Sequence, residues 1–220
     1  MEKYLILDMG KVLVWPSTGS WYITPVFLKN VDMTKIDQDS LEKAIDKYKY
    51  ILNEKAVTID EEYIVIGKFF KNLFKELEYD ISEEKIKTIL DDFVYNLSDT
   101  KYYLYDDVKE ELERLSKKYT LLMLSYNWTC GEEYLKKHDI HKYFKKIYIS
   151  SVYGCMKEDK IFFDYLINDF NINKGDALYV DDREDLLDIG VEKGLNVLHM
   201  DRENEFSNSK YKRIHNLKEI

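Results

Sequence analysis

The sequence contains few residues of the kinds that crosslink a chain or bind soft metals. It has two cysteines, Cys130 and Cys155, which are too few and too far apart to suggest a disulfide framework or a metal knuckle. Its four histidines include no pair at a recognised ligand spacing. Any metal bound by this chain should therefore be a hard cation held by carboxylates.

Long apolar runs are also missing. No stretch of about 18 apolar residues occurs, and the chain does not open with a basic segment followed by an apolar one. We therefore expect a soluble, cytoplasmic protein with no membrane association.

Basic residues are outnumbered. The 33 basic and 42 acidic side chains give a formal net charge of −9, which argues against binding nucleic acid through its phosphates. Small anionic substrates stay possible, because a few local cations suffice to bind them. The length of 220 residues suits one domain, or one domain with an insertion.

An apolar run near the start of the chain predicts a buried strand. Residues 4–7 are apolar without interruption and are followed by Asp8 and a glycine turn, which is typical of a strand in a parallel sheet. Residues 14–30 contain both prolines, and we expect a loop there. From there to about residue 99 apolar residues recur at helical spacing, with a capping box at residues 58–61. Three helices without a strand indicate a helical insertion.

Helices and strands alternate from about residue 100 onward. We expect helices around 104–115, 129–137 and 161–166 and up to 193, and strands at 121–124, 147–149, 177–180 and 196–199. This alternation predicts an α/β fold with a doubly wound parallel sheet. We assign residues 1–14 and 100–220 to this core and residues 15–99 to the helical insertion.

Polar residues end the three strongest predicted strands. Asp8 follows the first, Ser125 the second, and Asp181 and Asp182 the third, while Lys157 precedes the helix between the last two. Parallel strands share one carboxyl edge, so these groups could converge. A carboxylate nucleophile, a hydroxyl, a cation and further carboxylates for Mg²⁺ would form a phosphoryl-transfer site.

Each of these residues also has an ordinary structural interpretation. Asp8 could cap the turn that follows it, and Ser125 or Asn127 could cap the next helix. Lys157 could be a solvated surface cation, and the paired aspartates could cap the helix after them.

The order and context of these residues resemble the haloacid dehalogenase superfamily of hydrolases, from Tyr4 to about Met200. The four motifs of that family are matched by residues 8–12 (DMGKV), 121–125 (LLMLS), 154–162 (GCMKEDKIF) and 178–182 (LYVDD). Each motif is weak alone, but four in the right order and spacing are specific. The resemblance implies a Rossmann-like core, and the insertion resembles the small helical cap of subfamily I.

The resemblance also implies a role for each matched residue. Asp8 would attack phosphorus and form an aspartyl-phosphate, while Ser125 and Lys157 would bind the phosphoryl oxygens. Mg²⁺ would be held by Asp8, the backbone carbonyl of Gly10 and Asp182. Asp181 would lie nearby and would contact the ion through a water molecule or contact its ligands. The expected enzyme is a Mg²⁺-dependent phosphatase, monomeric or homodimeric, acting on a small phosphorylated metabolite such as a sugar phosphate.

Gly10 departs from the family pattern. It replaces a second aspartate that acts as acid and base, and such groups contribute about 10²–10⁴-fold in rate. A subgroup with an Asp-x-Gly-x-Val motif, which includes phosphatases of glucose 1-phosphate, resembles this chain more closely. We therefore expect a fairly acidic leaving group, such as an anomeric or aryl one.

Three further departures leave other functions open. Leu186 stands where the family often has Asp or Asn, with Asp185 a candidate substitute, while Tyr126 and Glu158 replace the usual Asn and Pro. A catalytically impaired relative that binds a phosphorylated ligand or acts as a regulator is the first alternative. A metal-independent 2-haloacid dehalogenase is the second, and the paired acids 181–182 favour the phosphatase over it.

Four aromatic residues lie just after the motif strands, namely Trp15, Trp21, Tyr126 and Trp128. They either pack the core against the helical insertion or form an aromatic wall that selects an apolar or sugar leaving group.

Overall fold

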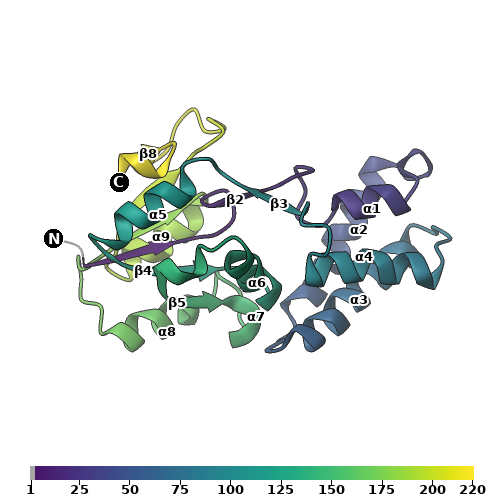
Figure 1. Ribbon diagram of the computed structural model, residues 1–220, viewed down its shortest axis with the longest axis horizontal. Coiled ribbons are helices and arrows are strands. Elements are labelled where there is room, and N and C mark those ends of the chain that lie inside the picture. Colours follow the sequence, from purple (N-terminus) through teal and green to yellow (C-terminus); the bar gives the residue numbers. More distant parts are fainter. Residues whose placement is uncertain (1–2) are drawn as a thin grey trace.

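The structure is a computed structural model that describes residues 3–220; residues 1 and 2, which the predicted core includes, lie outside the described residues. A six-stranded sheet has the order β5-β4-β1-β6-β7-β8, and all of its neighbouring strands run parallel (Figure 1). Its strands are β1 (Tyr4–Leu7), β4 (Thr120–Ser125), β5 (Phe144–Ile149), β6 (Ala177–Asp181), β7 (Asn196–Met200) and β8 (Arg213–Ile214). The predicted doubly wound α/β fold is confirmed.

Successive side chains of β1 enter different cores. Leu5 and Leu7 pack with residues of α5 (Val108–Ser116) and α6 (Thr129–Lys137), whereas Ile6 packs with residues of α8 (Lys160–Phe170) and α9 (Glu184–Glu192). Because side chains alternate across a strand, helices cover both faces of the sheet. A strand buried on both faces needs an unbroken apolar run, which is what residues 4–7 supply.

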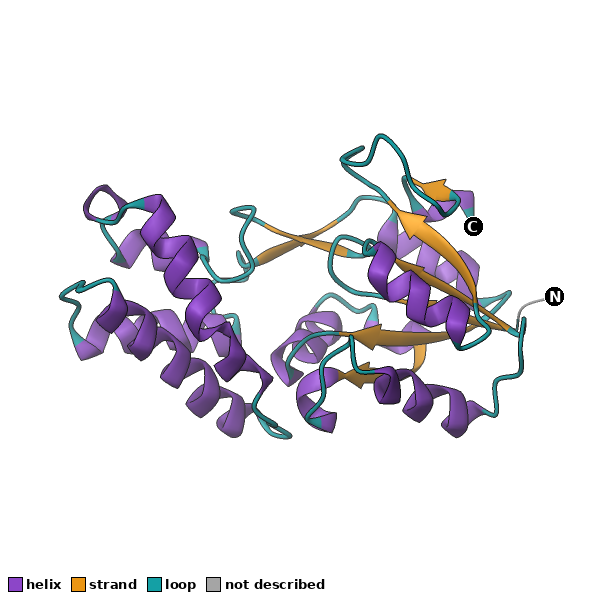
Figure 2. Ribbon diagram, turned by 180° about the vertical axis from the view of Figure 1, so that it is seen from behind, coloured by secondary structure: helices purple, strands orange, loops and turns teal. Residues whose placement is uncertain are grey.

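The segment between the first two motifs folds into helices with a separate apolar core. The helices are α1 (Pro25–Asn30), α2 (Gln38–Tyr48), α3 (Ile59–Glu76) and α4 (Glu83–Tyr95). The capping box predicted at the start of α3 is present, with Thr58 and Glu61 each bonded to the backbone of the other. Figures 1 and 2 show these helices grouped at one end of the molecule, apart from the sheet.

The prediction of a loop over residues 14–30 holds only for residues 17–24, which form neither helix nor strand, and is wrong on both sides of them. β2 (Val14–Pro16) pairs antiparallel with β3 (Tyr102–Leu104), and α1 begins at Pro25 with Thr24 as its N-cap. A threonine followed by proline at the first helical position is a helix-start signal. Leu104 likewise belongs to β3 and not to the helix expected there, and β8 adds a strand beyond the last one expected.

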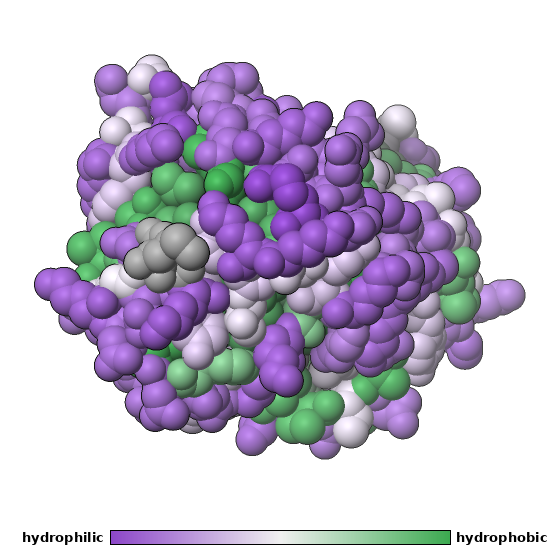
Figure 3. Space-filling model, turned by 60° about the vertical axis from the view of Figure 1, so that its left-hand side comes forward, coloured by the Kyte–Doolittle hydropathy of each residue, from purple (hydrophilic) through white to green (hydrophobic). Residues whose placement is uncertain are grey.

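Short helices complete the chain. α7 (Ser150–Tyr153) follows β5, and 3₁₀ helices cover Met33–Lys35, Lys49–Asn53, His141–Tyr143 and Leu217–Glu219. Within residues 3–220 no helix is long and apolar enough to cross a membrane. On the face shown in Figure 3, hydrophobic residues form patches between hydrophilic ones.

Candidate active site

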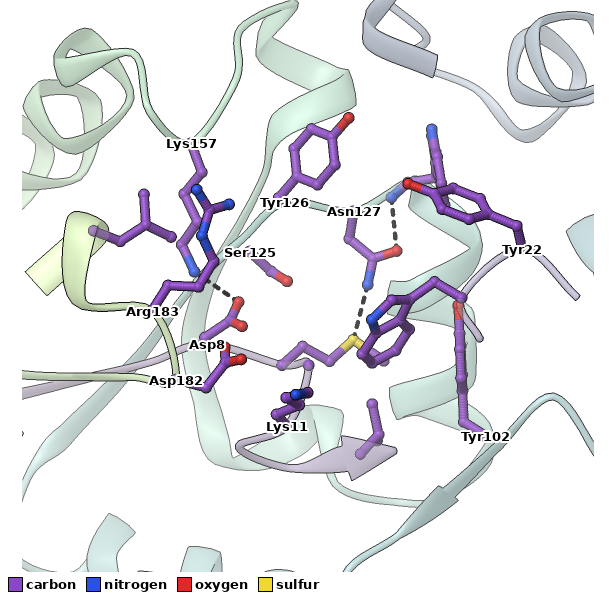
Figure 4. Close-up of a pocket in the computed structure, with 16 residues that line it drawn as sticks. Asp8, Lys11, Tyr22, Tyr102, Ser125, Tyr126, Asn127, Lys157, Asp182 and Arg183 are labelled. Carbon is purple, nitrogen blue, oxygen red and sulfur yellow. Dashed lines mark hydrogen bonds and ion pairs between the residues drawn. The ribbon is translucent and has the colours of Figure 1, made fainter. Parts of the chain in front are cut away.

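Side chains from the ends of three neighbouring strands meet in one pocket. β1 lies between β4 and β6, and all three run parallel, so their carboxyl ends open onto one edge of the sheet. The pocket there has a volume of about 270 Å³. Five of the predicted site residues line it, namely Asp8, Gly10, Ser125, Lys157 and Asp182 (Figure 4).

Lys157 is the central charge of this pocket. Its ammonium nitrogen lies 2.8 Å from Oδ1 of Asp8 and 2.5 Å from Oδ2 of Asp181. Its side chain is 2% exposed, which excludes a solvated surface cation. The loop that carries Lys157 begins at Gly154, which ends α7 in the left-handed conformation that glycine adopts readily.

Burial and charge shift the ionisation of Lys157 and Asp8. Removal from water raises the pKa of Asp8 above its ordinary value, although the charge of Lys157 opposes this. Burial acts to lower the pKa of Lys157, but the charges of Asp181 and Asp8 outweigh it and hold that pKa above its ordinary value. Lys157 therefore stays a cation at neutral pH, the state in which an ammonium group can bind an anion.

The two aspartates after β6 have different surroundings. Besides contacting Lys157, Asp181 accepts hydrogen bonds from the hydroxyl of Tyr179 (2.5 Å) and from the backbone N–H of Arg183 (3.0 Å). The Asp182 carboxylate makes no hydrogen bond or ion pair with any residue from 3 to 220. Burial and the charges of the neighbouring carboxylates raise the pKa of Asp182 to about 7.

The carboxylates fit a magnesium ion. Asp8, Asp181 and Asp182 each offer one oxygen, and these oxygens lie within 4.8 Å of one another. Mg²⁺ prefers oxygen ligands, and a cation here would relieve the repulsion among the carboxylates. Within the described part of the chain, the backbone carbonyl of Gly10 accepts no hydrogen bond and is available as a further ligand.

Ser125 ends β4 at the pocket, and its hydroxyl has no hydrogen-bond partner among the described residues. The cap of α6 comes from elsewhere, and not from Ser125 or Asn127. The carboxylate of Glu62, on α3, accepts hydrogen bonds from the backbone N–H groups of Thr129 and Cys130, the second at 3.0 Å. The Ser125 hydroxyl is therefore available for a hydrogen bond to a ligand.

The residues that differ from the family pattern have different surroundings in the structure. A Cβ at Gly10 would lie 3.1 Å from two ring carbons of Trp21, so the indole stands directly beside this glycine. Leu186 is buried and lines the pocket. Asp185 does not take its place, because its carboxylate pairs with the guanidinium of Arg183, 2.5 Å away.

Two cations at the pocket were missed by the sequence analysis. Lys11 pairs with Glu205 at 2.8 Å, and Arg183 pairs with Glu158 at 2.6 Å. Figure 4 shows Arg183 beside Lys157 and Lys11 below the carboxylates. Their positions in the sequence could have indicated them, since Lys11 follows Asp8 by three residues and Arg183 follows Asp182 directly.

Of the four aromatic residues after the motif strands, some pack against the helical insertion and others face the pocket. Trp21, Tyr126 and Trp128 line the pocket, whereas Trp15 lies outside it. Trp128 is buried among the helices of the insertion and contacts the ring of Phe93 edge-on at 5.9 Å. Packing thus explains Trp128, while Trp21 and Tyr126 keep surface toward a ligand.

Comparison with known proteins identifies the class. The family model of haloacid dehalogenase-like hydrolases matches residues 30–199, and the chain belongs to this family. No curated protein matches the chain.

Solved structures share its fold. One is YfnB from Bacillus subtilis bound to magnesium, at 16% identity over 99% of this chain and 96% of that one, with a TM-score of 0.69. Another is the HAD family enzyme bt-2542 from Bacteroides thetaiotaomicron with magnesium and inorganic phosphate, at 16% identity over 94% and 98%, with a TM-score of 0.59. A third is a 2-haloacid dehalogenase from Pseudomonas syringae pv. Tomato DC3000, at 14% identity over 100% and 96%, with a TM-score of 0.65. At these identities the likeness establishes the fold alone.

Proposed function

We propose that this hydrolase is a Mg²⁺-dependent phosphatase of a small phosphorylated metabolite, of the Asp-x-Gly-x-Val type. The observation that carries the proposal is the buried Lys157 between Asp8 and Asp181, next to the unpaired carboxylate of Asp182. This arrangement offers a nucleophile, a fixed cation and ligands for a hard metal within one pocket. The magnesium and phosphate bound by bt-2542 support the same chemistry.

In the proposed reaction, an oxygen of Asp8 bonds to phosphorus as the bond from phosphorus to the leaving oxygen breaks. The leaving oxygen keeps the electron pair of that bond. Water then cleaves the aspartyl-phosphate, which releases phosphate and restores Asp8. Lys157 and Ser125 hold the phosphoryl oxygens, and Asp181 fixes Lys157. Bound Mg²⁺ would add positive charge that offsets repulsion between Asp8 and the phosphate dianion.

We further propose that residues 15–99 act as a cap on a core of residues 1–14 and 100–220. The separate apolar core of α1–α4 supports this division. So does the pocket, because it is lined both by residues of the sheet edge and by Trp21 and Tyr22, which precede α1. Specificity would then depend on which cap residues contact the leaving group.

The test is hydrolysis of p-nitrophenyl phosphate by the wild type and by Asp8→Asn, each with Mg²⁺ and with EDTA. We expect activity that requires both Asp8 and Mg²⁺. Asp39→Asn, which changes an exposed aspartate on α2, serves as the matched control and should keep full activity.

A phospholigand-binding protein without activity is the second candidate, and the indole beside Gly10 favours it because no acid–base group stands there. Absence of turnover together with phosphate binding in calorimetry would establish that candidate. Halide release from 2-chloropropionate that persists in EDTA would instead establish a dehalogenase.

A further inference from the structure

Trp21 occupies the space in front of Gly10. A Cβ built on Gly10 lies 3.1 Å from both Cη2 and Cζ2 of the indole and 3.7 Å from Oδ2 of Asp8. The first two distances are shorter than ordinary van der Waals contacts, so any side chain at position 10 would have to displace the ring. The backbone is no obstacle, because Gly10 is not among the glycines with positive φ. The indole is therefore the group that a side chain at position 10 would have to displace.

The indole is held in this place by its surroundings. Its ring lies 5.7 Å from the ring of Tyr102, which is buried. The chain next to it is fixed by the hydroxyl of Ser20, which accepts hydrogen bonds from the backbone N–H groups of Tyr22 and Ile23 at 3.3 Å each. Trp21 is only partly buried and lines the pocket. It therefore offers part of its indole to a ligand.

Two other polar side chains that line the pocket already have partners. The ammonium of Lys11 is paired with Glu205 at 2.8 Å, and the hydroxyl of Tyr126 donates to Oδ1 of Asn53 at 2.5 Å. Figure 4 shows Tyr22 and Tyr102 on the side of the pocket opposite Lys157 and Arg183. A phosphoryl group bound at Lys157 would thus direct its leaving group toward aromatic side chains.

We propose that Trp21 is the specificity-determining residue of this site, binding the ring of a cyclic leaving group in the place of an acid–base side chain at position 10. This inference rests on the proposed phosphatase function and narrows its substrates. They are phosphate esters of cyclic leaving groups that depart without a proton from the protein, as aryl and anomeric phosphates can. The leaving oxygen departs as an anion and takes its proton from water.

Leaving-group dependence tests the first half of this proposal. With Mg²⁺, the wild type, Gly10→Asp, Trp21→Ala and the double variant are compared on substituted phenyl phosphates and on glycerol phosphate. We expect the wild type to turn over glycerol phosphate at least about 100-fold more slowly than p-nitrophenyl phosphate, the lower end of acid–base contributions. Gly10→Asp alone should bring no gain on glycerol phosphate, whereas the double variant should gain about 10-fold or more.

Ring recognition tests the second half. Trp21→Ala should raise the KM for p-nitrophenyl phosphate about 2- to 10-fold, the range of one aromatic contact, while the inhibition constant of inorganic phosphate stays unchanged. Trp21→Phe should restore most of the KM. Trp15→Ala is the matched control, because Trp15 lies in the same segment but outside the pocket, and it should leave KM unchanged.

Three results would overturn the proposal: equal turnover of alkyl and aryl phosphates by the wild type, a gain from Gly10→Asp alone equal to that of the double variant, or an unchanged KM in Trp21→Ala. Failure of the proposed function is a different result, namely no hydrolysis above the Asp8→Asn background. In that case calorimetry with phenyl phosphate and inorganic phosphate decides. Tighter binding of phenyl phosphate that is lost in Trp21→Ala supports recognition by Trp21, and equal binding of the two ligands refutes it.

Discussion

Replacement of Glu62 by glutamine should destabilise the protein through a contact that joins α3 to α6. The Glu62 side chain is fully buried, and its two carboxylate oxygens accept the backbone N–H groups of Thr129 and Cys130 separately. The hydroxyl of Ser151 adds a contact at 3.5 Å. Glutamine has the same size but only one accepting oxygen, so its amide group would face one of these N–H donors.

The expected loss of stability in Glu62→Gln comes from that unpaired N–H donor and not from the lost charge. Burial is the largest influence on Glu62 and raises its pKa, which means that removal of the charge from water outweighs the gain from the two N–H groups. Loss of the charge is therefore not the cost. A buried donor without an acceptor costs about 1–3 kcal/mol, and for a chain of this size that lowers Tm by about 2–12 °C.

The measurement is thermal unfolding together with hydrogen exchange at the amides of Thr129 and Cys130. We expect faster exchange of one of these amides and a lower kcat/KM, because the pocket residues Ser125, Tyr126 and Trp128 immediately precede α6. Glu84→Gln, on the exposed face of α4, is the control and should change stability by less than about 0.5 kcal/mol. An unchanged Tm with unchanged amide exchange in Glu62→Gln would refute the reasoning.

Three other perturbations have expected outcomes. Burial and neighbouring carboxylates raise the pKa of Asp182 to about 7, so its contribution to stability is present below its ordinary pKa and is lost as the pH rises through about 7. The gain in Tm from added Mg²⁺ should therefore grow between about pH 5.5 and 8. A gain that does not change with pH would contradict this. Lys157→Met removes the cation that contacts the buried carboxylates of Asp8 and Asp181, and it should cost about 3–5 kcal/mol in urea unfolding at neutral pH and less in acid. A cost independent of pH would exclude this cause. Gly131→Ala places a Cβ 2.5 Å from Nδ2 of Asn127 and should lower Tm and kcat/KM. Gly67→Ala is the control, because the nearest contact of its Cβ is at 3.5 Å, and it should be neutral or stabilising. Equal effects of the two substitutions would count against the packing argument.

The sheet edge was predictable from sequence because its strands are buried on both faces. Such strands carry unbroken apolar runs, and the runs at residues 4–7, 121–124 and 177–180 each end at a polar residue that lies at the site. Their separation by helices implies parallel pairing, which brings their ends to one edge. The convergence of Asp8, Ser125 and the paired aspartates 181–182 could therefore be inferred before the structure.

The contacts that complete the site could not be predicted because both partners lie far apart in the chain. β2 and β3 have three residues each, too few for a periodic pattern, and are stabilised by pairing with each other. Glu62 on α3 resembles any helical glutamate until α6 is placed against it. The position of Trp21 beside Gly10 likewise depends on the whole path of the chain between β2 and α1.

The pairing of β2 with β3 has a consequence for how this protein could have acquired its helices. Pro16 faces Tyr102 across the ribbon, so the chain leaves the sheet and returns to it at adjacent points (Figure 1). The intervening residues 17–101 could be excised and the ribbon closed by a tight turn without rerouting the chain around the sheet. By the same geometry, a helical segment of another length or sequence could be grafted there, and the catalytic edge would acquire a new substrate range with its own architecture unchanged.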